Sequence, residues 1–216
     1  LEALRNGKNG NAKTAGIIPD MRSNPGGLLD QAVVVSDLFL ASGQIVSTRG
    51  RHQDSTQLFN ASGRDAAKNM PVVVLVNGTS ASAAEIVAGA LQDRGRAVLV
   101  GTSTFGKGSV QTVIRMPNDG ELTLTWAHFH APSGYSIDRL GVFPTICTST
   151  ALAATQGLAE ALEQGQLRNV VDLTQRRAAD AFADKGKDEL HKACPYQAGA
   201  DSDLVHRRLF FTTHLS

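Results

Sequence analysis

Ser82 and Lys107 are the residues of this chain whose types and settings best fit covalent chemistry. Ser82 belongs to the run Asn77-Gly78-Thr79-Ser80-Ala81-Ser82-Ala83-Ala84-Glu85, and Lys107 lies between two glycines, 25 residues further on. A serine hydroxyl becomes an effective nucleophile only when a base takes its proton, and a lysine held neutral by burial is such a base. Together the two side chains predict attack on a carbonyl carbon and transfer of an acyl group.

The backbone around Ser82 offers donors for the oxyanion that forms in such an attack. We expect Ser82 in the first turn of a helix, so the Ala83 amide has no partner inside the helix and favours negative charge. A second donor is expected from the pair Gly26-Gly27, where any side chain would block the approach of a substrate.

Each feature also has a simpler explanation. Ser82 and its neighbours Thr79 and Ser80 are residue types that cap helices, and a loop lysine is usually solvated. The two glycines fit a tight turn, and Gly-Lys-Gly lacks the upstream glycines of a phosphate-binding loop. The prediction of chemistry therefore rests on the combination.

The six histidines give little support to a serine–histidine–aspartate triad. His128 and His130 alternate in a predicted strand, so both face one side, but no carboxylate or cysteine with metal-ligand spacing accompanies them. We expect strand or surface roles for both residues, and the sequence predicts no metal and no organic cofactor.

The hydrophobic pattern places these residues on an α/β scaffold. Residues 71–76 predict a buried strand, 81–93 a helix and 97–101 a further strand, which together favour a parallel pair. Residues 110–116 and 122–130 flank Pro117-Asn118-Asp119-Gly120 and predict a hairpin. Outside these elements we expect a strand at 15–21, weakened by Pro19, a helix at 28–41, a short strand at 44–48, and helices at 151–164, 173–193 and 201–211.

Composition excludes several classes of function. The 216 residues are 42% hydrophobic and 19% charged, as expected of one globular domain with or without an appendage. The 21 basic and 20 acidic residues give a net charge of +1 with no basic block, which argues against nucleic acid as a partner. No segment approaches the ~20 apolar residues of a membrane helix. We expect residues 1–13 to belong to the interior of a longer protein, because they do not have the pattern of a secretory leader.

Five segments of the chain, in order, resemble the C-terminal processing peptidases, or tail-specific proteases, of serine peptidase family S41. The segments are Asp20-Met21-Arg22-Ser23-Asn24-Pro25-Gly26-Gly27-Leu28-Leu29, Gly78-Thr79-Ser80-Ala81-Ser82-Ala83-Ala84-Glu85, Thr104-Phe105-Gly106-Lys107-Gly108-Ser109-Val110-Gln111, Pro132-Ser133-Gly134-Tyr135-Ser136-Ile137 and Gly141-Val142-Phe143-Pro144. They cover about residues 14–147 at family-like spacing.

The resemblance implies a serine–lysine dyad, with Ser82 as the nucleophile, Lys107 as the general base and Gln111 orienting the lysine. It further implies that the amides of Ala83 and of Gly27 or Gly26 form the oxyanion hole. The supporting side chains that it implies are Glu85, Asp93 and Thr104. For Glu85 and Asp93, pairing on a helix surface explains the residue types equally well.

The resemblance also implies a mixed α/β spiral core similar to the Clp-protease and crotonase group. The catalytic core would be residues 1–148, followed by a helical appendage at 149–216. Family members usually carry a PDZ domain, and none is recognisable here. The implied substrates are unfolded proteins or proteins with an exposed C-terminus. The implied compartment is the bacterial periplasm or cell envelope. The protein is also expected to be compatible with assembly into a homo-oligomer.

Two further questions stay open at this point. Cys147 and Cys194 are either buried thiols or one disulfide tying the C-terminal tail to the core; the disulfide is slightly favoured and needs an oxidising compartment.

Two other functions also fit parts of the sequence. A crotonase-like acyl-CoA enzyme explains the glycines but not Ser82 with Lys107, and a catalytically silent relative would bind or scaffold partners.

Overall fold

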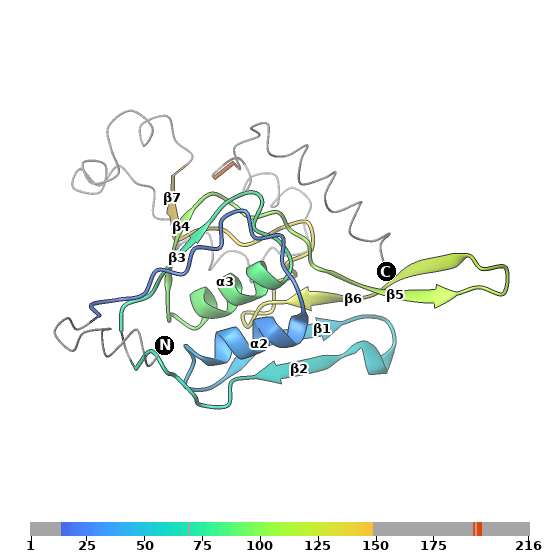
Figure 1. Ribbon diagram of the computed structural model, residues 1–216, viewed down its shortest axis with the longest axis horizontal. Helices are drawn as coiled ribbons and strands as arrows, with labels where there is room; N and C mark the ends of the chain where they lie inside the picture. The colour runs from blue at the N-terminus through green and yellow to red at the C-terminus, as the bar shows by residue number, and fades with distance from the viewer. Residues whose placement is uncertain (1–13, 69, 149–191, 193, 196–216) are drawn as a thin grey trace.

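Two sheets and two α-helices make up the part of the chain that the computed structural model describes, which is residues 14–68, 70–148, 192, 194 and 195 (Figure 1). One sheet is antiparallel with strand order β2-β1-β6-β5, and the other is parallel with order β3-β4-β7. The strands are β1 (Gln44–Arg49), β2 (Gln57–Asn60), β3 (Val73–Val76), β4 (Val98–Gly101), β5 (Ser109–Arg115), β6 (Glu121–His130) and β7 (Ile146–Cys147). The helices are α2 (Leu29–Asp37), α3 (Ala83–Asp93) and the 3₁₀ turn η1 (Gln53–Ser55).

The predicted strand–helix–strand unit is confirmed. β3 and β4 pair in parallel from Val73↔Val98 to Val76↔Gly101, with α3 between them in the chain. α3 lies between this sheet and α2 (Figure 1). Every residue of α3 from Ala83 to Leu91 is buried, which its alanines and Gly89 permit because small side chains allow close approach on all sides. The first turn of α3 is therefore held in the core of the fold.

Two of the predicted elements differ from the structure. Residues 15–21 form no continuous strand: only isolated parallel bridges occur, Ile17↔Val72 and Asp20↔Leu75. Pro19, between them, accepts from the Leu75 amide but has no amide of its own to donate. The helix expected at 28–41 ends at Asp37, and Phe39 and Leu40 are buried beyond it. The predicted helices after residue 150 lie outside the described residues, apart from Lys192, which is helical.

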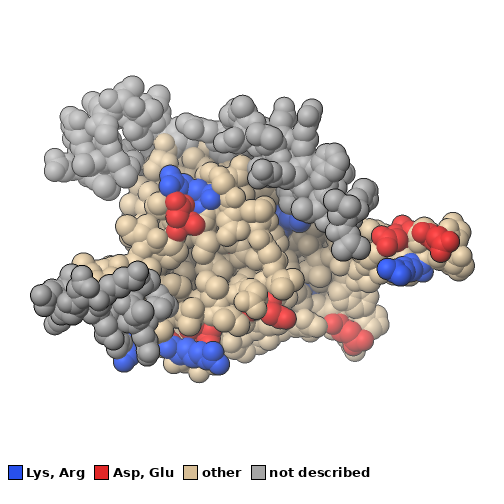
Figure 2. All heavy atoms as spheres, viewed as in Figure 1, with Lys and Arg blue, Asp and Glu red and all other residues tan. Residues whose placement is uncertain are grey.

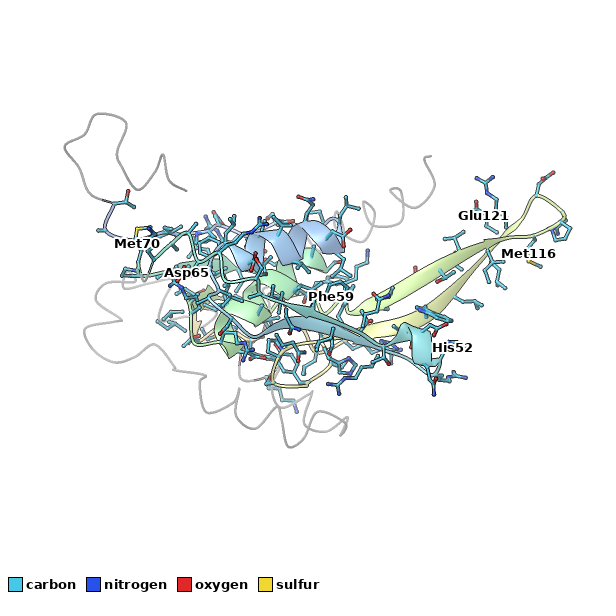
Figure 3. The ribbon with its side chains drawn as sticks, turned by 90° about the horizontal axis from the view of Figure 1, so that it is seen from below. His52, Phe59, Asp65, Met70, Met116 and Glu121 are labelled. Carbon is cyan, nitrogen blue, oxygen red and sulfur yellow. A yellow bond between two sulfur atoms is a disulfide. The ribbon has the colours of Figure 1, made fainter. Side chains whose placement is uncertain are left out.

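The predicted hairpin is the ribbon formed by β5 and β6, which projects from the body of the molecule (Figure 1). Figure 3 shows Met116 and Glu121 near its tip, away from the helices. Ile114 pairs with Leu122, and Leu124 follows two positions later on β6, so these three share one face; Trp126 lies at a bulge between Thr125 and Ala127. All four side chains are more than 40% exposed.

Cys147 and Cys194 are joined by a disulfide, and both are fully buried. Ser103 also contacts this segment, because its hydroxyl donates to the Cys194 carbonyl at 2.6 Å. The segment containing Cys194 therefore packs against the chain just before the loop that carries Lys107.

Charged side chains on the face shown in Figure 2 occur in small groups of both signs rather than as one patch. Within the described part of the chain, no helix is long and apolar enough to cross a bilayer.

Candidate active site

Ser82 lies in the sharp turn between β3 and α3. Its backbone has φ 55° and ψ −116°, a conformation that residues with a side chain seldom adopt. The strain is of order 1–3 kcal/mol and must be offset by the surrounding contacts. The sequence predicted that the helix begins at residue 81, but it begins at Ala83, and Ser82 precedes it as the N-cap residue. The turn presents the half-buried Ser82 side chain immediately before the free amides of the helix.

Glu85 connects this turn to the loop that carries Lys107. Its side chain is completely buried, so pairing on a helix surface, one of the two explanations offered above, is wrong for this residue. Its carboxylate accepts four hydrogen bonds, from the Ser82 amide (2.7 Å), the Thr104 hydroxyl (2.5 Å), the Gly106 amide (2.6 Å) and the Lys107 amide (2.9 Å). Thr104 is fixed in turn, because its hydroxyl accepts from the Val142 amide at 2.7 Å.

One oxygen of Glu85 brings Ser82 and Lys107 together. The amides of both residues donate to the same atom, Oε2, at 2.7 and 2.9 Å. Their backbone nitrogens can therefore be no further apart than the sum of these two distances. A second link joins the same segments, because the Phe105 amide donates to the Ser80 carbonyl at 3.0 Å. The fold thus brings the backbones of Ser82 and Lys107 close together.

Burial and hydrogen bonding act in opposite directions on the pKa of Glu85. The loss of water around it raises the pKa of the Glu85 carboxyl above its ordinary value, and the four donated hydrogen bonds act in the opposite direction by favouring the charged form. A carboxylate in this position is costly to bury, and its donors make the burial tolerable.

The Lys107 loop has no space for side chains at its glycines. Gly106 has φ +86°, and a Cβ at Gly108 would lie 2.1 Å from the Asp138 amide nitrogen. The Gly106 and Gly108 carbonyls accept from the Arg139 and Phe129 amides at 2.8 and 2.7 Å. Lys107, half-buried, makes no ion pair among the described residues. Gln111 lies on β5 with its side chain exposed, and no hydrogen bond within the described residues joins it to Lys107.

The two glycines of the Asn24-Pro25-Gly26-Gly27 turn have different environments. The Gly26 amide donates to the Asn24 side chain at 2.9 Å, whereas the Gly27 amide has no hydrogen-bond acceptor among the described residues. A pocket of about 170 Å³ lies between this turn, α2 and the start of α3. Its lining includes Gly27, Leu28, Ala32, Val35, Ala83 and Val87. The arrangement leaves the Gly27 amide, rather than that of Gly26, available to a group in the pocket.

The different environments of Gly26 and Gly27 make a testable pair. A Cβ at Gly26 would lie 2.7 Å from the Ser82 Cβ, at a φ of +105°, whereas a Cβ at Gly27 would meet nothing within 4 Å. We expect Gly26→Ala to lower the free energy of unfolding by about 2–4 kcal/mol, from overpacking and backbone strain. Gly27→Ala should stay within about 0.5 kcal/mol of the parent. Urea denaturation of the three proteins measures the difference, and equal stabilities would contradict the close packing of Gly26 on Ser82.

The remaining predicted residues lie elsewhere. Asp93, at the other end of α3 from Glu85, accepts from the amide and hydroxyl of Ser133 at 3.0 and 2.7 Å and so holds the turn after β6. His128 and His130 are on β6, as expected. His128 Nδ1 lies 3.4 Å from an oxygen of Asp138, and burial lowers the pKa of His130.

Asn77 and Ser80 take part in the site although the sequence analysis gave them no role beyond the turn. The Asn77 side-chain oxygen accepts from the amides of Ser23 (2.9 Å) and Thr79 (3.2 Å), and the Ser80 hydroxyl donates to the Met21 carbonyl at 2.7 Å. An asparagine that directly follows a buried strand and begins the serine turn was the available signal.

Comparisons with known proteins identify the family of the chain. A family model described as "Peptidase family S41" matches residues 1–148. A carboxy-terminal-processing protease of Bartonella bacilliformis is 53% identical over 140 residues, which are 65% of this chain and 32% of that protein. A carboxyl-terminal-processing protease of Synechocystis is 44% identical over 129 residues, 60% of this chain and 30% of that protein.

Among solved structures, the photosystem II D1 C-terminal processing protease superposes with a TM-score of 0.57 at 36% identity, over 61% of this chain and 34% of that one. The chain thus spans about a third of the length of these relatives.

Proposed function

Because the chain belongs to peptidase family S41, we propose that it is a serine peptidase in which Ser82 is the nucleophile and Lys107 the general base. The observation that carries the proposal is the shared Glu85 oxygen, which holds the backbones of both residues at hydrogen-bond distance from one atom. The strained turn at Ser82 supports it, since strain of this kind persists mainly where function requires it.

The proposed reaction has two halves. Ser82 Oγ attacks the carbonyl carbon of a peptide bond while neutral Lys107 Nζ accepts its proton. The carbon–nitrogen bond then breaks, the Lys107 ammonium returns the proton to the leaving amine, and an acyl ester remains on Ser82. A water molecule attacks the ester, gives a proton to Lys107, and Ser82 is released with its proton restored.

Two backbone amides would stabilise the oxyanion in both halves. Ala83 is the first residue of α3, so its amide lacks an intrahelical partner and benefits from the helix dipole. We assign the second amide to Gly27, because that of Gly26 already donates to Asn24. Gln111, Thr104 and Asp93 keep supporting roles in the proposal; the contacts described above give Thr104 a direct link to Glu85.

The substrate class follows from the names of the relatives and from the pocket. Relatives named for carboxy-terminal processing support a protein substrate that is cut near its C-terminus. The largely apolar pocket beside Gly27 and Ala83 would take a small apolar side chain next to the scissile bond. We place the protein in the bacterial periplasm or cell envelope, with residues 1–148 as catalytic core, residues 149–216 as an appendage and self-association open to test. The curated relatives include chloroplast and Staphylococcus proteins, so the compartment needs its own measurement.

The test of the proposal is cleavage of an unfolded polypeptide whose C-terminal residues are varied. We expect mass spectrometry to find cuts clustered toward the C-terminus and following small apolar residues, because the pocket admits these. Cuts spread evenly along the substrate would contradict the C-terminal preference but not the peptidase activity.

The two other functions give distinct results in the same assay. A catalytically silent relative would bind the polypeptide without yielding any product. An acyl-CoA enzyme would leave the polypeptide intact and hydrolyse or isomerise an acyl thioester, with no dependence on Ser82.

A further inference from the structure

We propose that Asn77 is a positioning residue, which sets the separation between the Gly26-Gly27 turn and the N-terminus of α3. The assignment rests on the proposed function, since its purpose is to keep the Gly27 and Ala83 amides aimed at one oxyanion. Asn77 itself would touch neither substrate nor the reacting atoms.

The Asn77 side-chain oxygen is the centre of a local network. It accepts from the Thr79 amide and hydroxyl at 3.2 and 2.8 Å, and the Ser80 hydroxyl lies 3.3 Å away. These contacts fix the side chain on its own turn. A further donor, the amide of Ser23, comes from 54 residues earlier in the chain at 2.9 Å. Oδ1 thus links two segments that are distant in sequence.

Ser80 strengthens the same link. The fully buried Ser80 hydroxyl accepts from the Asn77 amide at 3.0 Å and donates to the Met21 carbonyl at 2.7 Å. One residue further on, the Ala81 amide donates to the Asn24 carbonyl at 2.9 Å. The Thr79 and Ser23 hydroxyls lie 3.3 Å apart, so residues 21–24 are tied at four points to residues 77–81.

The tolerance at this junction is small. The position of a Cβ on Gly26 would be 2.7 Å from Ser82 Cβ and 3.0 Å from the Ala83 nitrogen, so the two segments already touch. Oxyanion donors act well only at about 2.7–3.1 Å from the developing charge. A shift of the glycine turn by a few tenths of an ångström would separate the two amides, and Asn77 opposes that shift.

Only the oxygen of the Asn77 amide takes part, because the described residues give its Nδ2 no hydrogen-bond partner. Aspartate offers an acceptor of the same shape at this atom, whereas alanine offers none. Comparing the two variants therefore tests whether the hydrogen bonds to Asn77, and not the size of its side chain, position the two segments.

The experiment compares Asn77→Ala with Asn77→Asp in the full 216-residue chain. Asn118→Ala is the matched control, because the Asn118 oxygen also accepts a turn amide, that of Gly120 at 3.2 Å, but on the ribbon. We expect Asn77→Ala to lower kcat about 100-fold with KM little changed, because ground-state binding does not use the oxyanion amides. Asn77→Asp should stay within about threefold of the parent, since it keeps the acceptor.

A second readout makes the result independent of turnover. Hydrogen exchange of the Ser23 amide should quicken in Asn77→Ala and stay as in the parent in Asn77→Asp and Asn118→Ala. If Ser82→Ala cleaves as fast as the parent, the proposed function fails, and exchange still tests the network. If Asn77→Ala matches Asn118→Ala in kcat and exchange, or Asn77→Asp is as impaired as Asn77→Ala, the positioning role is overturned.

Discussion

Replacement of Ser82 or Lys107 by alanine should abolish peptide cleavage, with kcat falling at least 10³-fold in each variant. The residues act as a nucleophile and its base, so removal of either stops the covalent step, and the double variant should be little worse than each single one. Initial rates on an unfolded polypeptide measure the loss. Both variants should fold, because the backbone amides of Ser82 and Lys107 bind the Glu85 carboxylate and alanine keeps these amides.

The matched control for Lys107 is Lys68→Ala. Lys68 is exposed, and among the described residues it makes only a backbone contact, to Asp65, so its side chain should be dispensable. Activity close to the parent in Lys107→Ala would show that another group is the base. Equal loss in Lys68→Ala would show that the assay responds to surface charge.

Glu85→Ala should cause the largest loss of stability of any single change near the site. It removes a fully buried carboxylate and leaves four donors without their acceptor, for which we expect a loss of about 3–5 kcal/mol in the free energy of unfolding. Because the Ser82 turn and the Lys107 loop would then separate, kcat should also fall by 10²-fold or more in the molecules that remain folded. Urea denaturation and initial rates under fully folding conditions measure the two effects.

Two further variants serve as controls for the stability of Glu85→Ala. Glu121→Ala, on the exposed part of the ribbon, should change stability by less than about 0.5 kcal/mol. Glu85→Gln keeps the shape but removes the charge. Burial raises the folded pKa of Glu85 above the unfolded value of 4.5. The part of its stability contribution that comes from tighter proton binding is therefore complete below that value and is lost as the pH rises through the folded pKa. The parent should thus lose stability relative to Glu85→Gln over that range, and a constant difference would contradict the raised pKa.

Local patterns in the sequence predicted most of the scaffold. The apolar run before the serine turn, the alanine-rich helix and the ribbon around Asn118 each carry their signal within about ten residues. The strand prediction for residues 15–21 was wrong. Their apolar character indicates a strand, but Pro19 has no amide to donate to the hydrogen-bond ladder that a strand needs. The shortened α2 shows the same limit, since burial of Phe39 and Leu40 continues the apolar pattern after the helix has ended.

The candidate site was harder to read, because its contacts join distant segments. A glutamate in the first turn of a helix ordinarily faces solvent, and nothing near Glu85 in sequence reveals that its partners come from residues 104–107. The resemblance implied a supporting role for Glu85, but only the fold shows that its carboxylate joins the Ser82 turn to the Lys107 loop. Asn77 was missed for the same reason, since its link to Ser23 spans 54 residues.

The Cys147–Cys194 disulfide has a practical consequence for anyone who prepares this protein. The Cys194 carbonyl is the acceptor for Ser103, the residue immediately before Thr104 of the Glu85 network. A chain produced in a host cytosol, where thiols are kept reduced, would start without this covalent link. Lack of activity in a sample from such a host would therefore first have to be checked against the missing disulfide before it is attributed to Ser82. Thiol titration should precede every comparison of variants.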